Sequence, residues 1–191
     1  FLLSVVMMIL NNASFIIQWI ILFSVKDDFG GYDLRSVMLL WGLASASFGL
    51  ASIFFHNAFF LSDFIVEGKL DNLLVQPKNV LLASLTQKCE SSAFGDLIYG
   101  YLMFFLTGFS IKGFLLFTFF SITGCLVITA YRTIVHSSAF YIGKIDLFVD
   151  NVAGWITSFA TYPDIFRGVI KILLYTVVPI AVCAYYPVNI I

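Results

Sequence analysis

The sequence contains little charge. Asp, Glu, Lys and Arg make up only 11% of its 191 residues, whereas a soluble globular domain usually carries about 25%. A soluble chain with so few charged residues could not cover its own surface. The formal net charge of −1 also argues against a nucleic-acid partner, because proteins that bind nucleic acid present basic surfaces.

Residues and motifs that carry chemistry are scarce as well. The chain has two histidines and three cysteines, and it contains no HExxH, CxxC, GxSxG or GxxxxGK[ST] motif. These absences predict that the chain is not an enzyme by itself, hydrolyses no ATP and binds no cofactor or metal of its own. We expect Cys89, Cys125 and Cys183 to be free thiols in apolar surroundings.

Several long stretches contain no charged residue at all. They cover residues 1–25, 36–62, 97–111, 113–131 and 172–191. A helix needs about 20 apolar residues to cross a hydrocarbon core about 30 Å thick. Because polar and apolar residues do not alternate with period two, helices are favoured over a barrel. We therefore predict an all-α, polytopic integral membrane protein with a single transmembrane domain over residues 1–191.

The apolar stretches predict five transmembrane helices, at about 1–23, 37–61, 93–109, 114–134 and 142–161. The last stretch, 172–191, contains Pro179 and Pro187. Since proline removes a helix hydrogen bond and kinks the helix, we expect a broken or re-entrant hairpin there. In the second helix, small residues recur at a spacing of four, which lets two membrane helices approach closely. This predicted packing face consists of Gly42, Ser45, Ala46 and Gly49.

A long polar interruption separates the second and third predicted helices. It contains Glu67-Gly68-Lys69-Leu70-Asp71 and, further on, Pro77. Apolar residues recur there at helical spacing, which predicts short amphipathic helices at a membrane surface, split by Pro77. Lys and Arg divide five against five between the two sides of the predicted topology, so charge bias does not determine the orientation.

Two parts of the sequence resemble a known family. The first is Phe64–Pro77, which carries the pattern G-x-[LI]-D-x-x-L-x-x-P, and the second runs from Ser158 through Tyr162-Pro163 to Val178-Pro179 and Tyr185-Tyr186-Pro187. Together they resemble ABC transporter permeases of the type 2 exporter class, and more closely a bacterial subfamily of somewhat longer chains. The subfamily usually has Arg before the motif proline, where this chain has Gln76.

The resemblance implies a mechanism and partners. Such a permease pairs with a second permease, identical or related, and docks on a separate ABC ATPase subunit that holds ATP and Mg²⁺. Residues 63–78 would be a cytoplasmic coupling loop, in a multi-pass protein of the bacterial cytoplasmic membrane. The resemblance implies ATPase contacts by Glu67, Gly68, Lys69, Leu70, Asp71, Leu73, Leu74 and Pro77.

The resemblance also has consequences for the C-terminal part and for chain length. Tyr162-Pro163 would close the fifth helix, and Pro179 and Pro187 would form the hairpin before a sixth helix. We expect the intact chain to have six helices, preceded by an interfacial N-terminal helix.

Two alternatives stay open. A secondary transporter driven by an ion gradient would need ionisable residues at mid-membrane, and the first four predicted helices have none at their centres. A membrane-embedded enzyme, such as a lipid-modifying transferase, would need clustered His, Asp, Glu or Cys. His56 could bond at a helix end or relay protons, and Asp146 and Asp150 could bind a cation or be solvated.

Overall fold

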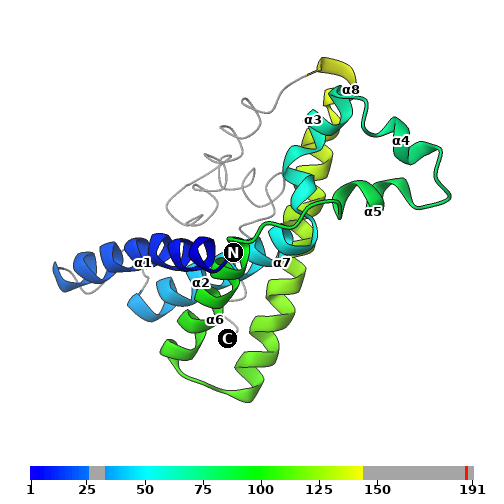
Figure 1. Cartoon of the computed structure of the whole chain (residues 1–191). Helices are drawn as coiled ribbons and strands as arrows, with labels where there is room; N and C mark the ends of the chain where they lie inside the picture. Colours follow the sequence, from blue (N-terminus) through cyan, green and yellow to red (C-terminus); the bar gives the residue numbers. More distant parts are fainter. Residues whose placement is uncertain (26–32, 144–187, 189–191) are drawn as a thin grey trace, which may run out of the picture.

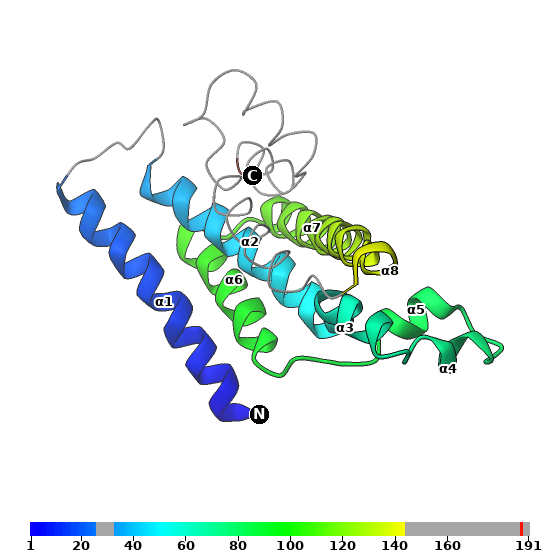
Figure 2. The same cartoon turned by 90° about the horizontal axis from the view of Figure 1, so that it is seen from above.

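The computed structural model describes residues 1–25, 33–143 and 188, which are mostly helical. Four longer helices form a bundle (Figures 1 and 2): α1 (Leu2–Val25), α2 (Leu34–Phe54), α6 (Ala93–Thr107) and α7 (Ile111–Ser137). The shorter elements are η1 (His56–Phe60), α3 (Leu61–Val66), α4 (Asp71–Leu74), α5 (Val80–Leu85) and α8 (Ala139–Ile142). These residues include no strand, which confirms the all-α prediction.

Three of the predicted spans have the length and composition needed to cross a membrane. They are α1, α2 and the apolar run Ile111–Ile142, which joins α7 to α8. The third predicted span is shorter, because α6 has 15 residues and reaches only about 22 Å at about 1.5 Å per residue. The predicted fifth helix, 142–161, and the predicted hairpin, 172–191, lie almost wholly outside the described residues.

The boundaries of α2 differ from the prediction at both ends. The helix begins early because Asp33 caps it, its side chain accepting a hydrogen bond from the Ser36 amide at 2.9 Å. It ends at Phe54, not near Leu61, since Phe55 leaves helical geometry (φ −131°, ψ 34°) and a 3₁₀ turn follows. The predicted single helix 37–61 is wrong in this respect, and the break turns the chain toward α3.

Helix α2 lies at the centre of the bundle, packed against both α6 and α7. Within its most apolar 18 residues 56% are buried, against 11% in α1. A soluble protein would bury such apolar helices, whereas a membrane protein leaves their outer faces to lipid. The main core cluster joins these three helices and consists of Leu39, Leu43, Ala46, Phe104 and Phe117.

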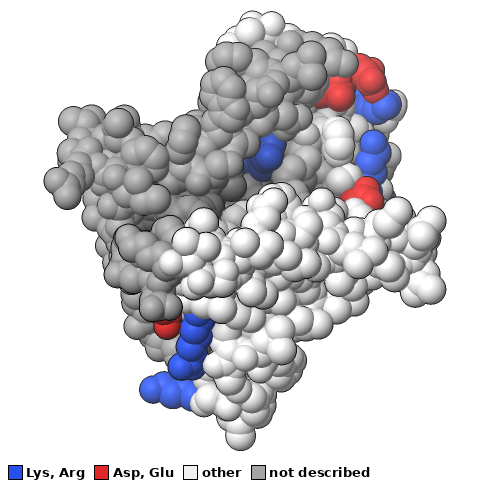
Figure 3. All heavy atoms as spheres, turned by 90° about the vertical axis from the view of Figure 1, so that its left-hand side faces the viewer, with Lys and Arg blue, Asp and Glu red and all other residues white. Residues whose placement is uncertain are grey.

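The bundle has two polar ends. Helices α3, α4, α5 and α8 lie toward one end, and the α6–α7 turn lies at the other (Figure 1). On the face drawn in Figure 3, charged side chains gather toward these ends, and the described surface between them is largely uncharged. This distribution fits a bilayer around the middle of the bundle.

Candidate functional site

The first candidate site is the segment that we call the α3–α5 extension, residues 61–85. Helix α3 packs against α7 and α8, whereas α4 and α5 project beyond the bundle (Figures 1 and 2). The extension contains all the residues that the sequence assigned to ATPase contact.

A glycine turn sets the direction of the extension. Gly68 has φ +69°, in the left-handed region that glycine adopts without penalty. The Lys69 amide donates to the Phe64 carbonyl at 3.1 Å, and the Gly68 amide donates to the Ile65 carbonyl at 3.1 Å. This pair of bonds is a Schellman motif, which ends α3 and satisfies its last carbonyls.

The leucines of the extension do not share one exposed face. Leu73 is only 7% exposed, so it packs within this chain and is not available to a partner. Leu74 is exposed and Val75 is 84% exposed. Together with two exposed leucines of α5 they form what we call the apolar tip: Leu74, Val75, Leu81 and Leu82.

The polar residues of the extension lie at its surface. Lys69 and Glu67 form an ion pair, and both side chains are exposed, so the pair contributes little to stability. Asp71 and Pro77 are exposed as well.

Helix α5 is joined to the bundle by buried contacts. Asn57 of η1 is 1% exposed and donates a hydrogen bond from Nδ2 to the Ser84 carbonyl at 2.6 Å. Leu85 packs in a buried cluster with Ala58 and Leu61. The N-terminus of α5 is capped by Asn79, whose side chain accepts from the Leu82 amide at 3.1 Å. The Asn57 bond and the Leu85 cluster hold α5 against η1 and α3.

The structure places the four small residues of the predicted packing face at the contact between α2 and α6. A Cβ added to Gly42 would lie 2.9 Å from the Met103 Cβ, and one added to Gly49 would lie 2.9 Å from the Ala93 carbonyl oxygen. Ser45 donates from Oγ to the Asp96 carbonyl oxygen at 2.9 Å. Ala46 belongs to the core cluster described above.

A second candidate site lies where α1, α2 and α6 meet. Asp96, in the first turn of α6, is 6% exposed. Its Oδ1 accepts a hydrogen bond from Asn12 Nδ2 of α1 at 2.6 Å. Its Oδ2 is buried and has no hydrogen-bond partner in the described part of the chain. A buried carboxylate oxygen without a partner is unfavourable, so Asp96 calls for a functional explanation.

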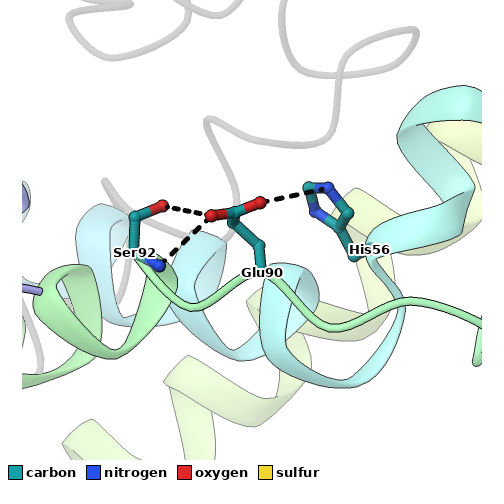
Figure 4. A network of polar contacts seen from close by, with 3 residues as sticks. All are labelled: His56, Glu90 and Ser92. Atoms are coloured by element: carbon teal, nitrogen blue, oxygen red, sulfur yellow. Dashed lines mark hydrogen bonds and ion pairs between the residues drawn. The ribbon is translucent and has the colours of Figure 1, made fainter. Parts of the chain in front are cut away.

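Asp96 lines a cavity of about 240 Å³. The cavity walls include Phe48, His56, Phe59, Phe60 and Glu90. One wall is the polar contact drawn in Figure 4, in which Glu90 Oε1 accepts from Ser92 Oγ at 3.0 Å and from the Ser92 amide at 3.3 Å. The other Glu90 oxygen lies 3.6 Å from His56 Nε2.

Burial lowers the pKa of the His56 imidazole; the Glu90 carboxylate raises it, and Lys88 lowers it further. The lowered pKa favours the neutral imidazole, which weakens its attraction to Glu90, and at 3.6 Å the contact is too long for a hydrogen bond. Among the described residues no group of His, Cys, Asp or Glu could hold a metal ion.

Sequence reasoning missed Asp96 and Glu90. Both lie at the edge of the polar interruption, where the sequence predicts that a carboxylate belongs to a solvated loop. The available signal was the position of Asp96 between Gly95 and an apolar run, because ionisable residues inside a membrane segment are functional candidates.

Several predicted residues fall outside the part of the chain that the structure describes. They are Asp146, Asp150, Tyr162, Pro163, Pro179 and Pro187. Their predicted roles stay predictions.

Comparison with known proteins gives one result. The sequence pattern of a family described as "ABC-2 family transporter protein" matches residues 8–191. No curated protein and no solved structure matches the chain. The match covers the spanning helices from residue 8 onward, the α3–α5 extension and the cavity, and it agrees with the resemblance of the Phe64–Pro77 pattern. The chain therefore belongs to the ABC-2 family of transporter proteins and is a multi-pass membrane permease.

Proposed function

We propose that this permease is one half of an ATP-driven exporter and that it docks on a separate ATPase subunit through the apolar tip. A second permease, identical or related, completes the pathway. ATP and Mg²⁺ are bound by the ATPase, and this chain supplies no catalytic group to hydrolysis. The end of the bundle that carries the α3–α5 extension faces the cytoplasm of a bacterial cell.

The observation that carries the proposal is the exposed apolar tip of the α3–α5 extension, which projects beyond the bundle. Leu74, Val75, Leu81 and Leu82 are exposed on α4 and α5 or at their ends. An apolar helical surface of this kind fits a hydrophobic groove on a partner. The surrounding charges, among them Glu67 and Lys69, would form the polar rim that protein interfaces usually have.

The way the extension is attached supports a coupling role. A force applied to α5 reaches η1 through the Asn57–Ser84 hydrogen bond and α3 through the packing of Leu85 on Leu61. Helix α3 in turn packs against α7 and α8. Movement of the ATPase would therefore reach a membrane helix through buried contacts, without passing through a flexible loop.

The test is a double substitution, Leu81→Asp with Leu82→Asp, in the complete transporter. Both residues are 53% exposed, and we expect the buried contacts of α5 through Ser84 and Leu85 to stay in place. Burying one leucine contributes about 1.5–3 kcal/mol, and we expect loss of ATPase copurification and of ATP-dependent transport. The permease itself should still insert and purify in normal amounts.

The matched control is Ile111→Asp, at the opposite end of the bundle. Ile111 is also exposed, so this variant carries the same kind of substitution away from the extension. It should keep the ATPase bound. Unchanged copurification and transport in the double variant would exclude the apolar tip as the docking surface.

A further inference from the structure

The cavity beside Asp96 combines a buried acid with aromatic walls. Phe48 and Phe59 contact each other edge to face, with ring centroids 5.3 Å apart, and the His56 ring lies 5.1 Å from Phe60. Asp96 and Glu90 both belong to the residues that line this cavity. Aromatic faces and carboxylates both attract cations, so the lining is selective for positive charge on an otherwise apolar molecule.

The arrangement of donors and acceptors indicates what kind of cation fits. Asp96 Oδ2 is a buried acceptor without a partner in the described residues, and Oδ1 is held by Asn12. A metal ion would need several oxygen ligands at short range, which the phenylalanine rings do not offer. An ammonium group can donate to Oδ2 and place its remaining surface against ring faces.

The size of the cavity limits the ligand. Sites for drug-sized molecules usually measure about 300–1,000 Å³, and this cavity measures about 240 Å³. It therefore accommodates a head group and not a whole large molecule. Met8 of α1 also lines it, and the neighbouring α1 residues Leu3 and Met7 are exposed where lipid would lie. An attached alkyl chain can follow that surface.

Two cations of the chain itself lie near the cavity. Lys88 Nζ is 5.5 Å from the Phe60 centroid, and the Arg132 guanidinium is 4.8 Å from the Phe59 centroid. Neither residue lines the cavity. Each of these two rings thus has a cation of this chain over it, and neither cation is bonded to Asp96 Oδ2.

We propose that this cavity binds the ammonium head group of an amphipathic amine, with Asp96 as its counter-ion and Phe48, His56 and Phe59 as its walls. The inference does not depend on ATPase docking, because the cavity lies between α1, α2, η1 and α6 and none of its lining residues belongs to the α3–α5 extension. The amine can belong to a membrane lipid or to a soluble amphiphile. Both present the same chemistry to the cavity.

The experiment measures binding of three probes with a twelve-carbon chain to the intact purified transporter in a maltoside detergent. Dodecylamine and dodecyltrimethylammonium carry a positive charge at pH 7, and dodecanol is the uncharged control. Since a hydrogen bond to a charged group exceeds a neutral one in strength, the amine should bind at least about tenfold more tightly than the alcohol. Asp96→Asn should abolish that difference, and Asp71→Asn, at an exposed carboxylate of α4, should keep it.

A second variant tests the proposal independently, in case Asp96→Asn does not fold. Met8→Trp fills the cavity from α1 and leaves the Asn12–Asp96 bond in place, so it should block all three probes. Equal affinity for amine and alcohol in the unmodified protein would overturn the proposal. So would an unchanged preference in a folded Asp96→Asn variant, or unchanged binding in Met8→Trp.

Nanodiscs distinguish the two sources of the amine. Dodecylamine, which keeps the N–H donors that the proposed contact needs, is titrated into transporter held in phosphatidylethanolamine discs and in discs of phosphatidylglycerol alone. Weaker binding in the first indicates that the lipid amine occupies the cavity. Equal binding in both indicates a site for a soluble amphiphile. Absence of binding in both kinds of disc would overturn the proposal.

Discussion

Asn57 of η1 donates its side-chain amide to the backbone carbonyl of Ser84 in α5, over 2.6 Å and in a buried environment. The two residues are 27 positions apart, and their bond joins the break after α2 to the far arm of the α3–α5 extension. The extension is therefore attached to the bundle both at α3 and at α5. The first prediction follows from this second attachment.

Asn57→Ala should loosen α5 without unfolding the bundle. The substitution leaves a buried carbonyl without its donor, which costs about 1–3 kcal/mol. Amide hydrogen exchange in α5 should become faster, and coupling of ATP hydrolysis to transport should weaken. The control is Gln76→Ala, which removes an exposed side-chain bond to the Asn72 carbonyl and should change stability by no more than about 0.5 kcal/mol. Equal exchange rates in α5 for both variants would contradict this prediction.

The stability of Gly68 variants should depend on how readily the new residue adopts the left-handed conformation. Gly68→Val forces a β-branched residue to φ +69°, with a penalty of about 1–2 kcal/mol or more. Gly68→Asn should be milder, since Asn visits this region. The measurement is the thermal unfolding of each variant together with the amount of ATPase that copurifies. Identical behaviour of the two variants would show that the conformation of Gly68 does not limit the extension.

Gly49→Val should separate α2 from α6. The added Cβ would lie 2.9 Å from the Ala93 oxygen and 2.9 Å from the Leu97 nitrogen, and backbone atoms cannot move aside alone. We expect a loss of about 1–3 kcal/mol in stability. Gly113→Ala should have the opposite effect, because its Cβ would meet Phe104 ring atoms at 3.5 Å and the Ser110 Cβ at 3.6 Å, which are ordinary contacts. It should stabilise α7 by about 0.5–1 kcal/mol. Unfolding temperatures in detergent distinguish the two variants, and a stable Gly49→Val protein would refute the close packing.

Acid should weaken the contact of Glu90 with Ser92. Hydrogen bonds from the Ser92 amide and hydroxyl lower the pKa of Glu90 below its ordinary value of 4.5. A carboxyl whose pKa is lower when folded stabilises the folded state above pH 4.5, and that contribution is lost as pH falls through the folded pKa. Ser92→Ala removes the hydroxyl donor and brings the folded pKa of Glu90 closer to its unfolded value, so the acid-induced loss should be smaller and complete at a higher pH. Ser14→Ala, whose hydroxyl contacts a backbone carbonyl, should leave the unfolding profile against pH unchanged.

Cys89 should report the orientation of the chain. Its thiol is exposed near the extension, whereas Cys125 is buried. In a variant with Cys125→Ser and Cys183→Ser, a membrane-impermeant maleimide should label Cys89 only after the inner face of the membrane has been opened. Labelling of intact cells would place the extension outside and would rule out ATPase docking there.

The sequence predicted those parts of the fold that depend on local composition. Charge-free runs located α1, α2 and α7, and the small-residue spacing located the face of α2 that meets α6. The break at Phe55 was not predicted, because the Asn57–Ser84 bond that accompanies it joins residues far apart in sequence. The burial of Leu73 was not predicted either. Helical spacing indicates which residues share one face of a helix, but it does not indicate whether another part of the chain packs on that face.

The short length of α6 sets the depth of Asp96 in the bilayer. A helix of about 22 Å cannot reach both surfaces of a hydrocarbon core about 30 Å thick, so either the bilayer thins beside it or one end stays below the surface. The Asp96 end has the polar neighbours Asn12 and Ser45 that such immersion requires. We therefore expect the hydrophobic mismatch at this end, and a molecule that reaches Asp96 would enter from the side of the lipid leaflet.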